Sequence, residues 1–473
     1  MPNRTTNVEL LNRLRDVLGG RRVSRSTLDR TNYSHDLWPR SVLQTRHGVV
    51  ERQPEMIVWP ETTEEVSRVL KICGEMRVPV IPFGAGSGLC GAAAPVNGGV
   101  ILDTKRMNKL ERISEKSMIA VCQTGIIGAH LEHELNRHCY TMGHFPGSFG
   151  TSTLGGYLAT RSAGQAATYY GRIEDMAISL QVVLADGTIV ETRTVPRRAT
   201  GPDFNHLFLG SEGTLGVITR ARMRIHQMPE ARAFRGLVFK DLKSGLTAMR
   251  KMLRFGLRPA VIRLSDEEDT SITIKALGIN VMGCLLVLVF EGRQTQIDME
   301  VRKAIELARA EGGRDHGEEP ARLWFTNRFA ESFRQSPILH NKGRLMDTVE
   351  VAATWSKLHG LYKTVRQAAD KKLTLLANFS HAYPEGCSIV FTFMGQAEND
   401  LELYDRVWRT LLDAVLKGGG ALSHQHGVGL LKAKWFVAQN PVAHAILCGL
   451  KRRLDPDNIL NPGKLALSPE GPC

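Results

Sequence analysis

Apolar residues near the start of the chain recur at helical spacing. Leu10, Leu14 and Leu18 fall on one face of a helix, and two glycines follow Leu18. This spacing predicts an amphipathic helix that buries one face, and glycine is typical of a helix end. We therefore expect residues 1–45 to form a helical arm with a linker.

From residue 56 onward, short apolar runs alternate with amphipathic stretches. Residues 56–59 and 78–83 predict strands, and residues 61–77 between them repeat apolar positions at helical spacing. Residues 99–103 predict another strand, and an Asp-Gly pair at 186–187 between two apolar runs predicts a hairpin. This β-α-β start followed by a strand meander favours an α+β fold over a doubly wound sheet.

Near residue 228 the pattern changes to longer elements. The helical stretches are 243–256, 298–312 and 399–417, and the apolar strands are 284–290 and 388–393. A chain of 473 residues exceeds what one hydrophobic core usually supports. We expect a first domain at 1–227, a second α+β domain at 228–439, and a turn-rich segment at 440–473 that returns to the first domain.

Glycines are concentrated in one loop after the second predicted strand. Gly86, Gly88 and Gly91 formally fit GxGxxG. A Rossmann fingerprint needs a helix to begin at this loop, whereas Pro95 and the strand that follows exclude one. The loop can still bind phosphate, because consecutive N–H groups without neighbouring Cβ atoms can converge on an anion.

Two further clusters of glycine and hydroxyl residues occupy residues 143–156 and 210–219. Three such clusters in one domain indicate a long ligand with phosphates and several polar edges. Their spacing alone does not name that ligand.

Together these segments resemble the FAD-binding domain of the vanillyl-alcohol-oxidase-type, or PCMH-type, flavoproteins. The resemblance is carried by the order and spacing of residues 82–88, 147–156, 160–163 and 212–218, and it extends to residues 455–464. It implies a PCMH-type FAD-binding domain of two subdomains. It also implies an α+β cap domain with an antiparallel sheet over the reactive face of the flavin.

The resemblance further implies which residues bind FAD. In that family the first loop cradles the pyrophosphate, and the later segments flank the isoalloxazine and adenine parts. Some members attach FAD through a histidine at the end of the first loop, where this chain has Ser87, so we expect non-covalent FAD. The expected cofactor-binding residues are Pro82, Phe83, Gly84, Ala85, Gly86, Ser87, Gly88, His144, Gly147, Ser148, Phe149, Gly150, Thr151, Ser152, Thr153, Gly155, Thr160, Arg161, Ser162, Ala163, Glu212, Gly213, Thr214, Leu215, Gly216, Val217 and Ile218.

Two branches of this family compete as the nearer relative. One contains D-2-hydroxyacid dehydrogenases, which oxidise D-lactate or glycolate. The other contains alkyldihydroxyacetonephosphate synthases, which exchange a fatty acyl group for an alkyl chain. Residues 170–175, 200–203 and 423–429 are similar to the synthase branch.

Each branch also has a feature that this chain lacks. The dehydrogenases hold a metal through two histidines seven residues apart and a later glutamate, but here His381 is followed by Ser388 and Gln425 at those positions. One imidazole is a poor zinc or manganese site, so we predict no metal. The synthases carry a proton-donating tyrosine where this chain has Val390. Their substrate-binding arginine falls near residues 336–340, where this chain has no arginine.

His424 and His426 lie between two groups of glycines. In an extended segment both imidazoles point to the same side. Histidine near a flavin can take the proton of a hydroxyl group or bind an anion, although both side chains can also be purely structural. We predict His424, His426 and Tyr383 as catalytic residues.

Arg263 lies in an apolar, strand-like run. A buried guanidinium is costly unless it is paired, so Arg263 either pairs with Asp266 or binds a carboxylate or phosphate of the substrate. We predict Arg263, His381 and Arg334 as substrate-binding residues.

The charge balance and the cysteines limit the partners and the location. With 61 basic and 48 acidic residues the net charge is +13, which attracts anionic partners. The chain lacks nucleic-acid-binding motifs, so we expect no nucleic acid. The eight cysteines are scattered without a CxxC pair and no signal-like segment precedes them, so we expect reduced cysteines and a cytoplasmic protein.

We therefore predict an FAD-dependent oxidoreductase. Its substrate is a small anionic hydroxy compound of the D-2-hydroxy acid type, oxidised by hydride transfer to flavin N5. Alkyldihydroxyacetonephosphate synthase-like exchange is the alternative within the enzymes, and a non-enzymatic protein that binds an anionic surface is the alternative of another class. A homodimer, a peripheral membrane contact and an electron-acceptor protein stay open as partners.

Overall fold

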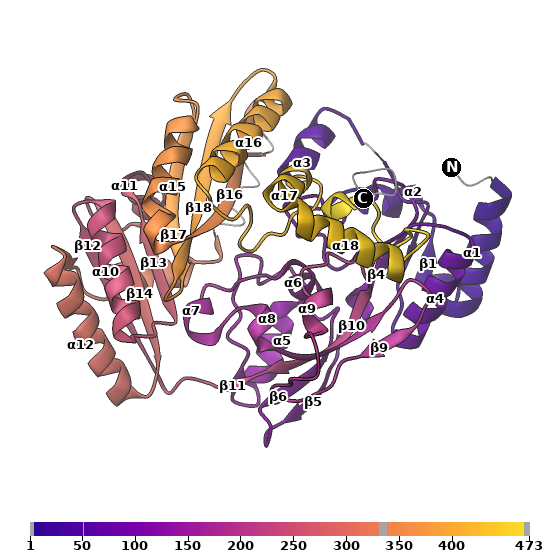
Figure 1. The fold of residues 1–473 in the computed structure, drawn as a ribbon, viewed down its shortest axis with the longest axis horizontal. Coiled ribbons are helices and arrows are strands. Elements are labelled where there is room, and N and C mark those ends of the chain that lie inside the picture. Colours follow the sequence, from indigo (N-terminus) through magenta and orange to yellow (C-terminus); the bar gives the residue numbers. More distant parts are fainter. Residues whose placement is uncertain (1–3, 51, 331–337, 340, 468–473) are drawn as a thin grey trace.

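The structure, a computed structural model, describes residues 4–50, 52–330, 338–339 and 341–467. Figure 1 shows two parts side by side, one built mainly from the first half of the chain and one from residues after 230. Within the described ranges no helix combines the length and the hydropathy that a membrane span requires.

A four-stranded sheet begins the first part. Its strands, in spatial order, are β1 (Val23–Ser24), β2 (Met56–Val58), β4 (Val100–Asp103) and β3 (Val80–Phe83). The last three are parallel, as the predicted β-α-β pattern requires, and α4 (Thr63–Glu75) connects β2 to β3. The arm helix α1 (Arg4–Leu18) packs against α4 and buries Leu10, Leu14 and Leu18. The linker also forms α2 (Thr27–Asn32) and α3 (Pro39–Arg46).

A five-stranded antiparallel sheet completes the first part. Its order is β5 (Leu110–Ser114), β6 (Ile119–Gln123), β10 (Val217–Arg224), β8 (Ala177–Val183) and β9 (Ile189–Glu191). The predicted Asp-Gly turn joins β8 to β9. The helices of this part are α5 (Gly128–Asn136), α6 (Leu154–Thr160), α7 (Ala167–Tyr170), α8 (Ile173–Met176) and α9 (Asn205–Phe208). A small ribbon pairs β7 (Tyr140–Thr141) with β11 (His226–Gln227).

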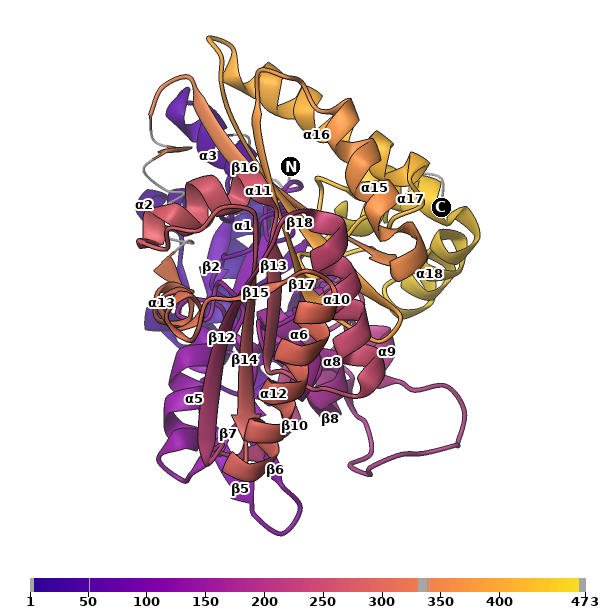
Figure 2. The same ribbon diagram turned by 90° about the vertical axis from the view of Figure 1, so that its left-hand side faces the viewer.

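The second part is one seven-stranded antiparallel sheet. In spatial order its strands are β15 (Arg314–Asp315), β12 (Ala231–Phe239), β14 (Cys284–Gly292), β13 (Val261–Ser265), β17 (Thr374–Ala382), β18 (Gly386–Gln396) and β16 (Arg344–Thr354). One face packs against α10 (Leu242–Phe255), α12 (Gln294–Ala310), α15 (Trp355–Ala368) and α16 (Asp400–Lys417) (Figure 2). The other face carries α13 (Glu319–Asn327) over a smaller apolar core, beside the short α11 (Glu267–Asp269).

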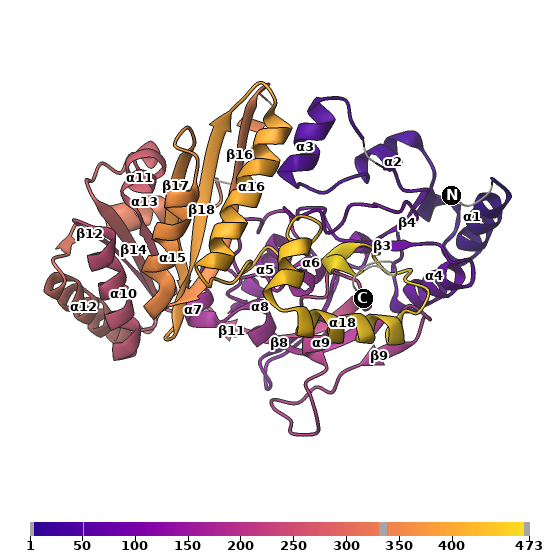
Figure 3. The same cartoon turned by 45° about the horizontal axis from the view of Figure 1, so that its top comes forward.

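Two segments cross between the parts. Helix α3 of the arm lies beside α16 of the second part, as Figure 3 shows. In the other direction, α17 (Ala433–Gln439) and α18 (Pro441–Leu454) follow the second part in sequence but lie over the first part (Figure 3). Leu460 then forms a parallel bridge with Val80 of β3. The chain thus closes against the strand that precedes the glycine-rich loop.

The cysteines depart from expectation at one position. Six of them are free thiols, namely Cys73, Cys90, Cys122, Cys139, Cys284 and Cys387. Cys448 is disulfide-bonded, which contradicts the expectation of reduced cysteines at this position; at the six others it stays a prediction.

Candidate functional site

The glycine-rich loop packs tightly against the second predicted segment. Gly84 follows β3 directly, and a Cβ atom on it would collide with Oγ1 of Thr153. Gly86 has a φ of +64°, and a Cβ there would lie 2.5 Å from the ring of Phe83. Only glycine tolerates both the left-handed backbone and this approach. The structure therefore brings together two of the segments that the sequence predicted as one site.

The same loop leaves its backbone donors free. Within the described residues, the N–H groups of residues 85–88 donate to no other protein group. The Ser87 and Ser152 hydroxyl oxygens lie 2.6 Å apart, and a Cβ on Gly150 would meet nothing within 4 Å. Unpaired N–H groups in a partly enclosed loop fit an anionic ligand such as a pyrophosphate.

Glu212 joins the third segment to the loop that carries the predicted histidines. Its carboxylate accepts from the N–H groups of Val428 at 2.6 Å and Gly429 at 2.8 Å. Burial raises the pKa of Glu212 to about 7, although these backbone donors oppose the rise. Gly213 packs on Pro82, which places this segment against the strand before the first loop. Glu212 thus acts first as a link between segments.

His144 is buried and both of its ring nitrogens lack a partner in the described residues. The ring lies edge-on to Tyr157 at a centroid distance of 4.8 Å. Burial, with a smaller contribution from the charge of Arg172, lowers the pKa of His144 to about 3. A buried, neutral imidazole with two unpartnered ring nitrogens fits the predicted place beside a polar cofactor.

Tyr383 and His424 lie next to each other although 41 positions separate them. The phenol oxygen is 3.1 Å from His424 Nε2, and Nδ1 of the same ring is 3.1 Å from Gln425 Oε1. Because an amide oxygen only accepts, Nδ1 carries the proton and Nε2 accepts from the phenol. Burial and the charge of Arg172 lower the pKa of His424 to about 4, and burial raises the pKa of Tyr383. A neutral acceptor therefore faces a neutral donor.

His381 lies against this pair because a β-bulge turns its side chain toward it. The register between β17 and β18 shifts between Ser380 and Ala382, and His381 has a φ of +51°. A bulge turns its extra residue out of the regular alternation. The ring of His381 stacks on that of His424 at a centroid distance of 5.2 Å. Burial, and then the neighbouring His424, lower the pKa of His381 well below its ordinary value.

His426 does not share the surroundings of His424. Residues 424–426 form a bend, so the expectation of an extended segment with both rings on one side is wrong. Nδ1 of His426 lies 3.8 Å from Glu350 Oε1, whereas the ring of His424 faces Tyr383. The backbone turns here because three successive N–H groups converge on one carboxylate.

That carboxylate belongs to Glu350, which the sequence analysis missed. It accepts from the N–H groups of residues 424–426, from Oγ of Ser423 at 2.7 Å and from Nζ of Lys432 at 2.6 Å. Burial raises its pKa, but the charges of Lys432 and His426 outweigh burial and lower it to about 2. The available signal was an acid between valines in the predominantly apolar run 349–353.

Arg263 forms an ion pair with an acidic side chain. Its Nη2 lies 3.3 Å from Asp269 Oδ2, and both side chains are buried. Among the described residues, the acid that pairs with it is Asp269 and not the expected Asp266, which instead accepts from the hydroxyl of Tyr362. The predicted Arg334 lies outside the described residues.

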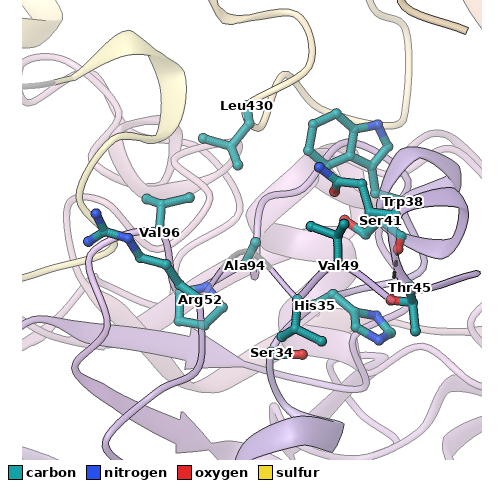
Figure 4. A pocket seen from close by; sticks show the side chains of 13 residues that line it. Ser34, His35, Trp38, Ser41, Thr45, Val49, Arg52, Ala94, Val96 and Leu430 are labelled. Atoms are coloured by element: carbon teal, nitrogen blue, oxygen red, sulfur yellow. Dashed lines mark hydrogen bonds between the residues drawn. The ribbon is translucent and has the colours of Figure 1, made fainter. Parts of the chain in front are cut away.

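A cavity of about 280 Å³ borders residues 94–96, which follow the glycine-rich loop (Figure 4). Its other walls come from α3, from the chain on either side of α3 and from Leu430. Trp38 on its wall also packs against Gly91. The lining includes none of the predicted catalytic or cofactor-binding residues.

In the part of the chain that the structure describes, no three His, Cys, Asp or Glu side chains are grouped closely enough to hold a metal ion. The predicted absence of a metal remains a prediction.

Both parts of the chain match known families. Residues 54–193 match the FAD binding domain, and residues 228–465 match the C-terminal domain of FAD linked oxidases. The chain is 32% identical to an alkyldihydroxyacetonephosphate synthase of Dictyostelium discoideum, with 90% of this chain and 75% of that protein covered. It is 30% identical to the FAD-linked oxidoreductase YgcU of Escherichia coli strain K12 (96% and 98% covered) and 27% identical to the glycolate oxidase subunit GlcD of Bacillus subtilis strain 168 (95% and 95%).

Solved structures agree with these matches. A structure of an alkyldihydroxyacetonephosphate synthase superposes with a TM-score of 0.83 at 28% identity and covers 96% of this chain and 84% of that one. p-Cresol methylhydroxylase superposes with a TM-score of 0.81 at 19% identity over 98% of each chain, which concerns the fold alone. The predicted α+β fold, FAD as the cofactor and an FAD-dependent enzyme are confirmed. The chain belongs to the family of FAD-linked oxidases.

Proposed function

We propose that the protein oxidises a small anionic hydroxy compound of the D-2-hydroxy acid type. The observation that carries this proposal is the buried contact between Tyr383 and His424 Nε2, in which the imidazole is neutral. Such a pair can accept the proton of a substrate hydroxyl group. When bound, FAD supplies the acceptor for the hydride.

His424 Nε2 is the final proton acceptor in this proposal. The phenol of Tyr383 already donates to Nε2, so a substrate hydroxyl that donates to the phenol oxygen can pass its proton through Tyr383 to the imidazole. The negative charge of Glu350 favours the imidazolium that results, whereas Arg172 opposes it. His426 lies beside Glu350 and does not face the phenol, so it stands outside this proton path.

The residues proposed to hold FAD are those of the three converging segments. The free N–H groups of residues 85–88 bind the pyrophosphate, and His144 and residues 147–153 lie beside the rest of the cofactor. Ser87 stands where some family members have the histidine that bonds to flavin. Because serine does not form that bond, the cofactor is held non-covalently. The division of the chain at residues 227 and 439 belongs to this proposal too.

The test is anaerobic reduction of the FAD-loaded protein. D-Lactate, glycolate and longer D-2-hydroxy acids are added, and the loss of visible flavin absorbance is followed. Reduction by one of them supports the proposal, and for a chiral acid the L enantiomer should reduce the flavin more slowly. An unchanged flavin spectrum with the whole series contradicts it. Acid precipitation of the same preparation should release all the yellow colour into the supernatant.

Acyl-to-alkyl exchange on dihydroxyacetone phosphate esters is the second candidate. It is favoured by relatives named alkyldihydroxyacetonephosphate synthase, which are 29–32% identical to this chain. Incorporation of a labelled fatty alcohol into acyl-dihydroxyacetone phosphate, without net flavin reduction, distinguishes it from oxidation. The cytoplasmic location, a homodimer, a membrane contact and an electron-acceptor protein remain predictions.

A further inference from the structure

Arg172 lies at the start of α8 in the first part of the molecule, and its side chain reaches the second part. Its Nη2 donates to the carbonyl oxygen of His424 at 2.6 Å and to that of Arg161 at 2.8 Å. Arg161 directly follows α6 and has a left-handed φ of +53°. One guanidinium therefore joins the end of a helix in the FAD binding domain to the bend that carries the candidate base.

Two other side chains near Arg172 also donate to backbone carbonyl groups of the second part. Gln165 Nε2 donates to the carbonyl oxygen of Arg328 at 3.3 Å, and the Thr168 hydroxyl donates to that of Ala382 at 2.9 Å. Ala382 lies between His381 and Tyr383 in the sequence. Residues 165–172 thus contact the second part beside each of the candidate catalytic segments.

The bend at residues 424–426 is held from two sides. From the second part, Glu350 on β16 accepts its three backbone N–H groups. From the first part, Arg172 donates to the carbonyl oxygen of His424. Backbone groups on both sides of the His424 Cα atom are therefore fixed. This orients the ring, so that Nε2 lies 3.1 Å from the phenol oxygen of Tyr383.

The guanidinium of Arg172 also brings a positive charge to this site. Its Nε lies 3.2 Å from Oε1 of Glu174, and Nη2 of Arg161 lies 3.2 Å from the same oxygen. One carboxylate thus serves two guanidinium groups, and these three side chains keep one net positive charge. The side chain of Arg172 is only 20% exposed, so solvent screens its charge less than it would at the surface.

That charge acts on the histidines of both parts. After burial, it is the largest influence that lowers the pKa of His424, and it also lowers the pKa of His144. Among the described residues, the titratable and charged groups that act on or contact the His424 ring are Tyr383, His381, Glu350, His426 and Arg172. Glu350 favours the protonated ring, whereas Arg172 and His426 oppose it.

We infer that Arg172 is a positioning residue that acts on the reaction through His424. Its hydrogen bond fixes the bend against the first part, and its charge disfavours protonation of the imidazole, so that the ring is available as an acceptor down to a lower pH. This inference rests on the proposed function, because it names the residue that tunes the base of that reaction.

The test follows protonation of His424 apart from turnover. The FAD-loaded protein, with labelled histidine, is titrated with acid and observed by NMR, and the His424 signals are those missing from His424→Asn. Arg172→Gln removes the charge but keeps a side-chain N–H donor. We expect it to raise the titration midpoint of His424 by at least about 0.5 pH unit. Arg172→Lys keeps the charge, so its midpoint should stay closer to that of wild type.

Arg137→Gln is the matched control, because it removes one positive charge from the same domain at an exposed ion pair with Glu134. The inference is overturned if Arg172→Gln titrates as wild type does, if Arg172→Lys shifts the midpoint as much as Arg172→Gln, or if Arg137→Gln shifts it equally. FAD content and thermal unfolding are measured for each variant.

A second variant covers a failure of Arg172→Gln to fold. Arg172→Gln combined with Glu174→Gln removes both charges of the pair, so no carboxylate is left buried without its partner. The midpoint of His424 should again lie above that of wild type, and an unchanged midpoint in this double variant overturns the inference.

Reduction by D-2-hydroxy acids separates this inference from the proposed function. If Arg172→Gln shifts the midpoint of His424 but no hydroxy acid reduces the flavin, the influence of Arg172 on His424 stands and the proposed function fails. If a hydroxy acid reduces wild type and Arg172→Gln with the same pH profile, the function stands and the role of Arg172 fails.

Discussion

Glu350 and Lys432 form an ion pair in which neither side chain is exposed to solvent, with Oε1 and Nζ 2.6 Å apart. The pair lies beneath the bend that carries His424, and Glu350 accepts three successive backbone N–H groups of that bend. Strand β16 and the segment after the bend therefore hold the candidate base between them.

Removing one charge of this pair should cost much more than removing both. Glu350→Gln leaves Lys432 charged and unpaired in the interior, so we expect the free energy of unfolding to fall by about 3–5 kcal/mol. Glu350→Gln combined with Lys432→Met should lose less than Glu350→Gln alone, because no buried charge is left. Urea unfolding of the FAD-loaded proteins measures this, and equal losses in both variants contradict it.

The same ion pair predicts how the stability of the folded protein depends on pH. The pKa of Glu350 is lowered to about 2 in the folded protein, so its stabilising contribution is complete above the unfolded value of about 4.3. It should be lost as the pH falls from about 4 to 2. In Glu350→Gln this part of the acid dependence should disappear, which thermal unfolding at a series of pH values reveals.

His424→Asn should slow flavin reduction by about 10²- to 10⁴-fold, the usual contribution of a general base. In wild type the rate should rise with pH through about 4 and stay level above it, because the neutral imidazole is the active form. Tyr383→Phe should slow the reaction while keeping FAD bound. Stopped-flow reduction measures the rates, and the exposed His206→Asn serves as the control. Wild-type rates in His424→Asn exclude it as the base.

Gly86→Ala should weaken FAD binding by about tenfold or more, since even 1.4 kcal/mol of strain is a factor of ten. Its left-handed φ and the Phe83 ring 2.5 Å from a new Cβ both oppose the change. Gly360→Ala in α15 meets nothing within 4 Å and should leave FAD binding unchanged while raising helix stability. Quenching of flavin fluorescence gives both constants. Unchanged affinity in Gly86→Ala indicates that the loop does not contact the cofactor.

Two aspartates of α16 that pair with basic residues of the arm should differ in their contribution to stability. Asp400 is fully buried and binds both Arg46 and His47, so Asp400→Asn should lower the free energy of unfolding by about 2–4 kcal/mol. Asp405 is 43% exposed and binds Arg40, so Asp405→Asn should cost less than about 1 kcal/mol. Limited proteolysis should also cut residues 19–35 faster in the first variant. Equal effects of the two substitutions contradict this difference.

The local sequence pattern was sufficient to predict these helices and strands and to locate the glycine-rich loops. Helices α4, α10 and α16 and strands β3, β4, β14 and β18 lie where periodicity predicted them, because each buries one face or both and its sequence shows which. The glycine clusters could also be recognised in the sequence. A left-handed φ or a close approach, as at Gly84 and Gly86, restricts the residue type at that position.

Only the tertiary structure decided which charged side chains meet. Spacing suggested Asp266 for Arg263, but the chain turns so that Asp269 reaches it, and it folds Glu350 under a bend 74 residues away. Local periodicity reports burial within one element, whereas charge pairing across elements depends on long-range packing that a single sequence does not encode in its spacing.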